Sequence, residues 1–309
     1  MKPIKLFVLS IFVVAITFFP ASSVVTYASE SDCSDLKVRY TEIQLTANEQ
    51  KLNSLLLESS SKGCLEMVQF LLIKGASAEA RGASGQTALH FAAKAGEEKI
   101  VDLLLDKGAN IEQRDLKGAT PLFLATEAKH REVVKVLLQR GAQAEAPGRS
   151  GTTPLSAAAF NGDTASVKLL LAAKADIKTT DISGKSPIIY AAARGFQSIV
   201  VLFLNSGIDI NSKYEHDLTL LMWASGHTND VPETDGLALV KMLIDKGAHL
   251  DEVDDRGKTA LMMAAELGHI EAVKELLQRG AKSDIKDKAG KFAVDNATNE
   301  EIKKLLQSH

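Results

Sequence analysis

Residues 85–96 read GQTALHFAAKAG, and the same pattern of residue types begins again 33 residues later as GATPLFLATEAK from 118. It returns three more times at this spacing, as GTTPLSAAAFNG from 151, GKSPIIYAAARG from 184 and DLTLLMWASGH from 217. After 40 residues it reappears as GKTALMMAAELG from 257, and after 33 more as GKFAVDNA from 290. A unit that recurs in register predicts a stack in which each unit contacts only its neighbours.

Each repeat carries the signals of two short helices. A threonine such as Thr87 precedes the first helix and is expected to cap it, and a proline such as Pro121 suits its first turn. The second helix is rich in Leu and Val and ends at a glycine such as Gly108. Lys174 takes this glycine position in the third unit, which predicts a weaker helix stop there.

The repeat length and the Thr-Pro-Leu-His-x-Ala start of the first helix resemble the ankyrin-repeat family over residues 52–309. The resemblance implies an all-α fold, an ankyrin-repeat solenoid of stacked helix-turn-helix units with short β-hairpin-like loops. Only His90 keeps the family's histidine, which bonds one unit to the next. We expect apolar contacts to replace that bond at the equivalent positions, which hold Phe123, Ser156, Ile189, Met222 and Met262.

The repeat boundaries divide the chain into capped segments. We expect a signal peptide at 1–28, a leading helix at 29–51, a degenerate capping repeat at 52–84, and a C-terminal cap at 290–309. The six repeats between them span 85–117, 118–150, 151–183, 184–216, 217–256 with an insertion, and 257–289.

The first residues have the pattern of an export signal. Lys2 and Lys5 precede an apolar run at 6–19, and small residues follow, so we expect cleavage after Ala28 or, alternatively, after Ser23. The protein would then act in the periplasm or outside the cell, with no membrane span after cleavage. A retained membrane anchor is the competing interpretation of the same residues.

The chain has two cysteines, Cys33 and Cys64, separated by 31 positions. In an oxidising compartment they are candidates for a disulfide that would tie the leading helix to the capping repeat. The alternative is a pair of small buried hydrophobic side chains.

Composition and motifs argue against catalysis and nucleic-acid binding. The 36 basic and 39 acidic residues create no overall positive field that would attract nucleic acid. The seven histidines (90, 130, 216, 227, 249, 269 and 309) are scattered without the spacing of a metal site. The GKS at 184 and GKT at 257 lack the upstream glycine of a phosphate loop. We therefore predict no catalytic residue, no metal, no cofactor and no enzyme activity.

A protein partner is the predicted ligand, and it would be bound by two sets of residues. On the first helices of the third to fifth units, the positions expected to face the concave side hold Phe160, Tyr190, Arg194, Trp223 and His227. The alternative is that the rings of Tyr190 and Trp223 belong to the core. The hairpin tips carry a row of cations that includes Arg114, Lys117, Arg149 and Lys185, for which a solvated edge is the alternative.

Seven extra residues in the fifth unit predict a polar loop within 228–236. The overall prediction is a monomeric, non-catalytic interaction module or scaffold. The alternative is an enzyme or small-ligand protein with a site near Trp223 to Asp235, which would require a deep pocket there.

Overall fold

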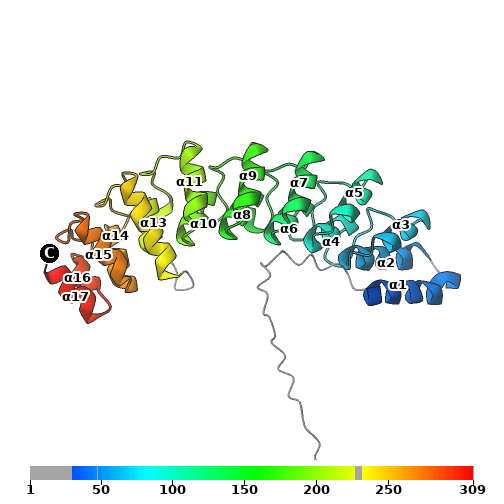
Figure 1. Cartoon of the computed structure of the whole chain (residues 1–309), viewed down its shortest axis with the longest axis horizontal. Helices are drawn as coiled ribbons and strands as arrows, with labels where there is room; N and C mark the ends of the chain where they lie inside the picture. The colour runs from blue at the N-terminus through cyan, green and yellow to red at the C-terminus, as the bar shows by residue number, and fades with distance from the viewer. Residues whose placement is uncertain (1–29, 47, 227–231, 309) are drawn as a thin grey trace, which may run out of the picture.

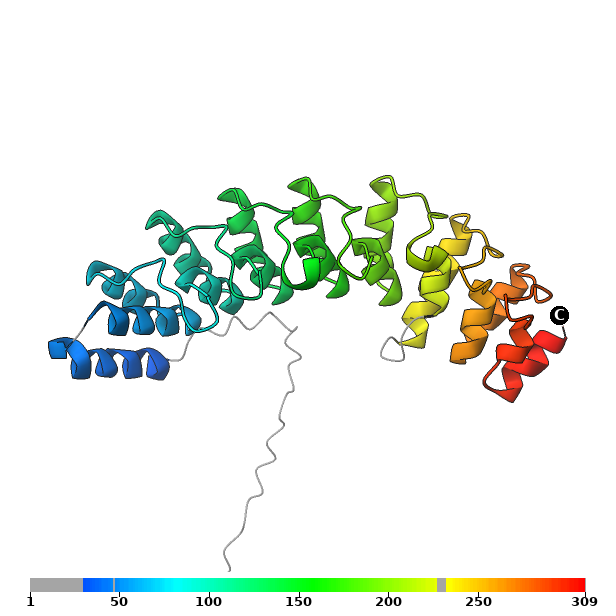
Figure 2. The same cartoon turned by 180° about the vertical axis from the view of Figure 1, so that it is seen from behind.

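The computed structural model describes residues 30–46, 48–226 and 232–308. Within these ranges the chain forms 17 α-helices and three short 3₁₀ helices, and no strand is present among them. The helix pairs stack side by side into a long arch (Figures 1 and 2). This confirms the predicted all-α solenoid. The predicted signal peptide and its cleavage site lie outside the described residues.

The arch consists of successive helix pairs preceded by a single helix, α1 (Glu30–Ile43). We call the pairs that begin after residues 85, 118, 151, 184, 217 and 257 units one to six. The capping pair is α2 (Glu49–Ser61) and α3 (Leu65–Ile73), and the units are α4 (Ala88–Ala95) with α5 (Glu98–Asp106), α6 (Pro121–Glu127) with α7 (Arg131–Gln139), α8 (Pro154–Phe160) with α9 (Thr164–Ala172), α10 (Pro187–Ala193) with α11 (Gln197–Asn205), α12 (Leu220–Ser225) with α13 (Glu233–Asp245), and α14 (Ala260–Leu267) with α15 (Ile270–Gln278). The C-terminal pair is α16 (Ala293–Asn296) and α17 (Glu300–Gln307).

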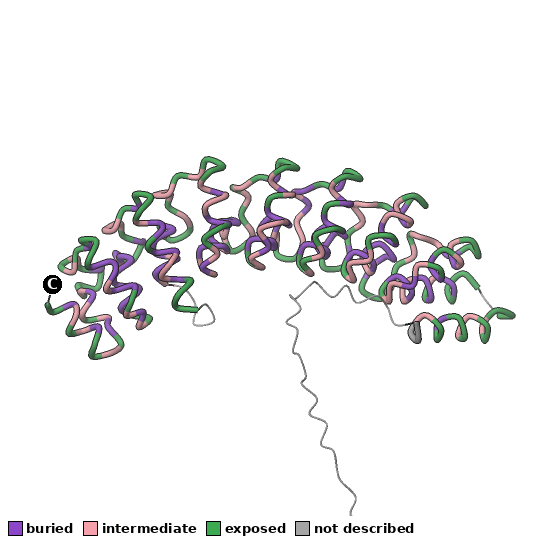
Figure 3. The backbone as a smooth tube through the Cα atoms, in the orientation of Figure 1, coloured by how far each residue is buried: buried purple, intermediate pink, exposed green. Residues whose placement is uncertain are grey.

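The core is a continuous layer between the two rows of helices. In Figure 1, α4, α6, α8 and α10 lie on the inner side of the arch and α5, α7, α9 and α11 on the outer side. Buried residues concentrate where the rows meet (Figure 3). Small side chains such as Ala92 and Ala125 are fully buried on the inner helices, and Leu104 and Leu137 are fully buried on the outer ones. Each such leucine contributes about 1.5–3 kcal/mol, available only when a neighbouring unit covers it.

Side chains at the start of the inner helices satisfy their first amide groups. Thr120 Oγ1 accepts from the Phe123 amide at 3.2 Å, and Thr153 Oγ1 accepts from the Ser156 amide at 3.1 Å. Prolines are the first residues of α6, α8 and α10, where a missing N–H leaves no bond unmade.

His90 makes the hydrogen bond between units that the family resemblance implied. Its Nδ1 accepts from the Thr87 amide at 3.1 Å, so Nε2 carries the proton and donates to the Ala119 carbonyl oxygen at 3.2 Å. Burial lowers the pKa of His90, which keeps the ring neutral. At the equivalent positions Phe123, Ile189, Met222 and Met262 are buried apolar side chains, as expected for a replacement by packing. Ser156 differs, because it is buried and its hydroxyl accepts from the Thr153 hydroxyl at 3.2 Å.

Adjacent hairpins are joined by backbone hydrogen bonds at some units and not at others. Four such bonds link the amides of Leu116, Ile182, Asp255 and Lys288 to the carbonyl oxygens of Ser84, Ser150, His216 and Arg256. At the two remaining junctions, between units two and three and between units four and five, the described residues form no equivalent bond. The hairpins there contain the 3₁₀ turns η2 (Arg149–Gly151) and η3 (Glu215–Asp217), with non-glycine residues at positive φ.

The insertion in unit five differs from the prediction. Helix α13 begins at Glu233 and has 13 residues, whereas the other outer helices of the units have nine, so residues 233–236 are helical and not a loop. Pro232 fixes a backbone suited to a helix start, and Glu233 and Asp235 interact favourably with the free amides of the first turn. The predicted loop positions 228–231 and His227 lie outside the described residues.

A disulfide between Cys33 and Cys64 joins α1 to the start of α3. Helix α1 also buries Leu36 completely, and its Tyr40 ring meets the edge of Phe70 with centroids 4.8 Å apart. Arg39 pairs with Glu58 on α2 at 2.6 Å. These few contacts leave α1 as the most weakly buried helix at this end, and the disulfide holds it in place.

We expect the double variant Cys33→Ser with Cys64→Ser to release α1. Closing a loop of 31 residues stabilises by roughly 3–4 kcal/mol in the chain-entropy model, which is comparable to what burial of Leu36 and the two surface ion pairs of α1 supply together. Hydrogen exchange should show lost amide protection in residues 30–43, with residues 88–278 unchanged. A reductant added to the native protein serves as control and should reproduce the loss. Full protection of α1 in the variant would contradict this expectation.

The outer helices end in a left-handed residue, and Lys174 occupies this place in unit three. Gly141 and Gly207 have φ of 93° and 98°, and Lys174 is forced to 64°. A side chain in this conformation crowds its own carbonyl group at a cost of about 1–2 kcal/mol. The strain is local, since nothing lies within 4 Å of where a Cβ would stand at Gly207.

Lys174→Gly should therefore raise the free energy of unfolding by about 0.5–1 kcal/mol, because relief of strain exceeds the added chain entropy of glycine. Urea denaturation followed by circular dichroism measures the change. The matched control is Gly207→Lys, which places the same strain in unit four and should lower stability by a similar amount. A destabilising Lys174→Gly would show that the lysine makes contacts worth more than its strain.

Candidate partner-binding surface

Aromatic side chains from three successive inner helices form one cluster. Phe160 is the last residue of α8, Tyr190 lies on α10 and Trp223 on α12. The rings of Phe160 and Tyr190 meet edge to face, with centroids 5.8 Å apart. We call these three residues the aromatic cluster. Phe160 remains 46% exposed, which is unusual for a ring in an otherwise well-buried repeat.

Two cations lie against the aromatic cluster. Lys185 Nζ is 6.0 Å from the centroid of Tyr190 and 5.9 Å from that of Trp223, so it bridges two units. The guanidinium carbon of Arg194 is 5.1 Å from the centroid of Phe160. All three distances suit attraction between a cation and the face of a ring. The structure thus brings together four of the five predicted inner-helix residues and adds Lys185 from the hairpin.

The repeat register explains why these rings reach the surface. Tyr190 and Trp223 hold the position that Leu124, Ala157 and Met263 occupy in other units, where those shorter side chains are buried. The two larger rings fill the same buried space and extend beyond it, so they are half-buried. One part of each ring therefore lies in the core, and the other part lies at the surface.

Hydrogen bonding makes Tyr190 a fixed, neutral donor. Its hydroxyl donates to the carboxylate of Asp181, which also accepts from the backbone amides of Ser183 at 2.8 Å and Lys185 at 3.1 Å. Burial and the bond to Asp181 raise the pKa of Tyr190 to about 12. Burial alone would raise the pKa of Asp181, but the hydrogen bonds it accepts outweigh burial and lower it. The oxygens of Asp181 thus already accept hydrogen bonds, and its lowered pKa makes the carboxylate a weak base. Asp181 is therefore not suited to act as a general base.

The indole N–H of Trp223 is buried and has no acceptor among the described residues. An unsatisfied buried donor costs about 1–3 kcal/mol. Because the N–H is buried, it lies out of reach of a partner that binds the surface.

Some cations in the predicted row on the hairpin tips are bonded within the chain, and others are exposed without an ion pair. Arg114 donates to the carbonyl oxygens of Gly118 at 3.0 Å and Pro147 at 2.7 Å, so it braces adjacent hairpins. Lys213, Arg256 and Lys258 pair with Glu252, Asp254 and Glu266. Lys117 and Arg149 are exposed, and neither forms an ion pair within the described part of the chain.

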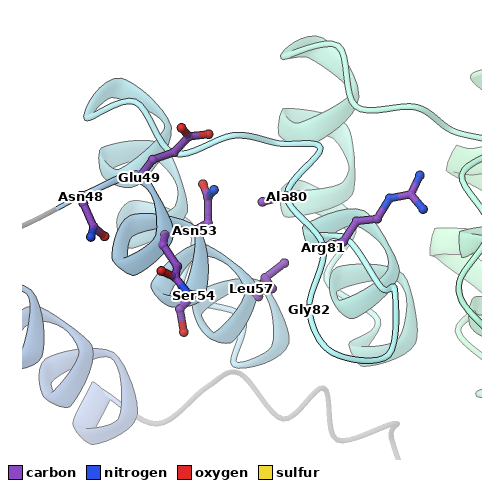
Figure 4. A pocket seen from close by; sticks show the side chains of 9 residues that line it. Asn48, Glu49, Asn53, Ser54, Leu57, Ala80, Arg81 and Gly82 are labelled. Atoms are coloured by element: carbon purple, nitrogen blue, oxygen red, sulfur yellow. The ribbon is translucent and has the colours of Figure 1, made fainter.

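A hollow of about 630 Å³ lies at the other end of the arch, between α2 and the loop at 80–82 (Figure 4). Its walls are mainly polar, with Asn53, Ser54 and Arg81 around Leu57. The alternative prediction of a ligand site near Trp223 to Asp235 requires a pocket there, and this hollow does not include those residues. Across the described ranges no group of three His, Cys, Asp or Glu side chains is placed to hold a metal ion.

The sequence analysis assigned Lys185 to the charged edge and missed its position against the rings. A comparison of equivalent positions in the repeats could have predicted this position. Lys258 has the same place in unit six, and its partner Glu266 corresponds to Ala193 in unit four. Without a carboxylate eight residues further on, Lys185 lies over the aromatic faces.

Stacked helix pairs with projecting hairpins and an exposed cluster of aromatic and cationic side chains define a helical-repeat protein. A sequence model of ankyrin repeats (three copies) matches residues 55–147, 144–214 and 213–289. The chain therefore belongs to the ankyrin-repeat family, whose members are generally protein–protein interaction modules and typically non-catalytic.

Individual relatives resemble only part of the chain. Mouse ankyrin repeat domain-containing protein 63 is 34% identical over 85 residues, which is 28% of this chain and 21% of that protein. Its human counterpart is 40% identical over 55 residues, or 18% and 14% of the two lengths. The match thus spans about a fifth or less of these relatives. Among the described helices, none combines the length and apolar character needed to cross a bilayer.

Proposed function

We propose that this protein is an exported, non-catalytic binding module that holds a protein partner against the aromatic cluster of units three to five. The observation that carries the proposal is a chain of contacts across three successive units: Phe160 meets Tyr190, Lys185 lies against Tyr190 and Trp223, and Arg194 lies against Phe160. Aromatic and arginine side chains contribute most to interface energies when a partner removes them from water. The ring of Phe160, which is 46% exposed, supports a surface that a partner covers.

Export is supported by two independent features. The pattern of Lys2, Lys5 and the apolar run at 6–19 has the order of a secretory signal. The disulfide between Cys33 and Cys64 suits an oxidising compartment such as the periplasm or the exterior. We further propose that the module acts as a monomer, since helix α1 and the pair α16 and α17 close the two ends of the stack.

The double variant Tyr190→Ala with Trp223→Ala should weaken partner binding by about 30-fold or more, because two anchor rings of interface type are lost. The measurement is capture of proteins from an envelope extract by the immobilised processed chain, with circular dichroism as the check on folding. The matched control is Phe91→Ala, which removes an aromatic ring from the same repeat position in unit one. Equal capture by the folded double variant and the native protein would overturn the proposed surface.

A site-specific photocrosslinker makes the test independent of affinity. Placed at Phe160, it should form adducts with the captured protein. Placed at Ile73, which is 79% exposed at the end of outer helix α3, it should form none. Adducts at Ile73 alone would place the contact elsewhere on the arch.

Export predicts that the mature protein begins at Ser29, or at Val24 if cleavage follows Ser23, because signal peptidase cuts after small residues. N-terminal sequencing of protein from the envelope fraction and the medium measures this directly. A chain that still begins at Met1 in the membrane fraction would favour a retained anchor.

A further inference from the structure

We propose that Lys185 is a docking point for a carboxylate on an acidic segment of the partner, received between the rings of Tyr190 and Trp223. This inference rests on the proposed function and specifies the chemistry of the partner. It depends on the two rings that Lys185 contacts and on the carboxylate that is missing beside it.

Unit six provides an internal comparison. Lys258 follows Gly257 as Lys185 follows Gly184, so the two lysines hold the same repeat position. Lys258 Nζ is 2.6 Å from the carboxylate of Glu266, and its side chain is only 13% exposed. In this repeat position, therefore, a lysine reaches a carboxylate at the end of the inner helix of its own unit.

In unit four the carboxylate is missing. Ala193 stands in the place of Glu266, and Lys185 forms no ion pair with any described residue. The carboxylate of Asp181 accepts from the Tyr190 hydroxyl and the Lys185 amide, and neither Asp181 nor Glu215 forms an ion pair with the Lys185 ammonium group. Lys185 therefore lies against two ring faces with no ion-pair partner among the described residues. A carboxylate from a partner would complete the arrangement that Glu266 completes in unit six.

The neighbouring charges favour an acidic segment over a single carboxylate. Lys117, Arg149 and Lys185 belong to the hairpins of units two, three and four, and none is paired among the residues described. In the hairpins of units five and six, Lys213, Arg256 and Lys258 pair with Glu252, Asp254 and Glu266. Around the aromatic cluster, the unpaired positive charge therefore lies on its N-terminal side. Complementary charge of this kind increases the association rate and selects against basic partners.

Trp223 is the only tryptophan of the chain, so its fluorescence reports directly on this site. The probes are three capped pentapeptides with a central phenylalanine, of sequences EEFEE, QQFQQ and KKFKK, titrated at low ionic strength into the processed protein. We expect a saturable change with EEFEE that weakens as salt is added, and no saturable change with the other two. Lys185→Met should weaken EEFEE binding by about fivefold or more. Polarisation of a labelled EEFEE peptide checks the result without relying on the indole.

The matched control is Lys258→Met, which removes the equivalent lysine from unit six and should leave EEFEE binding unchanged. Lys185→Glu should abolish it. Absence of saturable binding by EEFEE, equal binding of QQFQQ, or no effect of Lys185→Met would each overturn the acidic partner. Failure of the acidic partner can be told apart from failure of the proposed function. Capture of a partner by the native protein, and its loss in the Tyr190 and Trp223 double variant, are measured without any assumption about the charge of the partner.

Discussion

Burial between neighbouring helix pairs is the interaction on which the rest of the structure depends. The inner helices α6, α8 and α10 have seven residues each, too few to persist alone in water. Their alanines and the leucines of the outer helices leave water only when another pair is stacked against them. The register of the stack is therefore fixed, and it determines which side chain of each unit reaches the surface.

Because the register is fixed, a difference between repeats at one position changes the chemistry of the surface there. The same inner-helix position holds a buried Leu124 in unit two and a half-buried Tyr190 in unit four, with no change in the backbone plan. Likewise, exchange of glutamate for alanine at the end of an inner helix separates the neutralised Lys258 from the ring-bound Lys185. The candidate surface is thus a local departure from the repeat pattern, built on a frame that the pattern stabilises.

The sequence was sufficient for the fold because the 33-residue period places most helices, caps and stops in register. The register also predicted that Phe160, Tyr190, Arg194 and Trp223 share one side of the stack, where the structure places them; their role in binding stays a prediction. The sequence analysis did not identify the position of Lys185, which depends on the absence of a partner eight residues away. It misassigned residues 233–236, because the polar residues that suit a loop also suit the first turn of a helix such as α13.

Units four and five are joined without a backbone bond between their hairpins, so side chains carry this junction. Tyr190 belongs to unit four and Trp223 to unit five, and the side chain of Lys185 lies against both rings. In the loops that follow the outer helices, the side-chain oxygen of Asn211 accepts from the His249 amide at 2.8 Å, and Lys213 pairs with Glu252 at 3.0 Å. The two units beneath the aromatic cluster are therefore held by side chains where four other junctions add a bond between backbones.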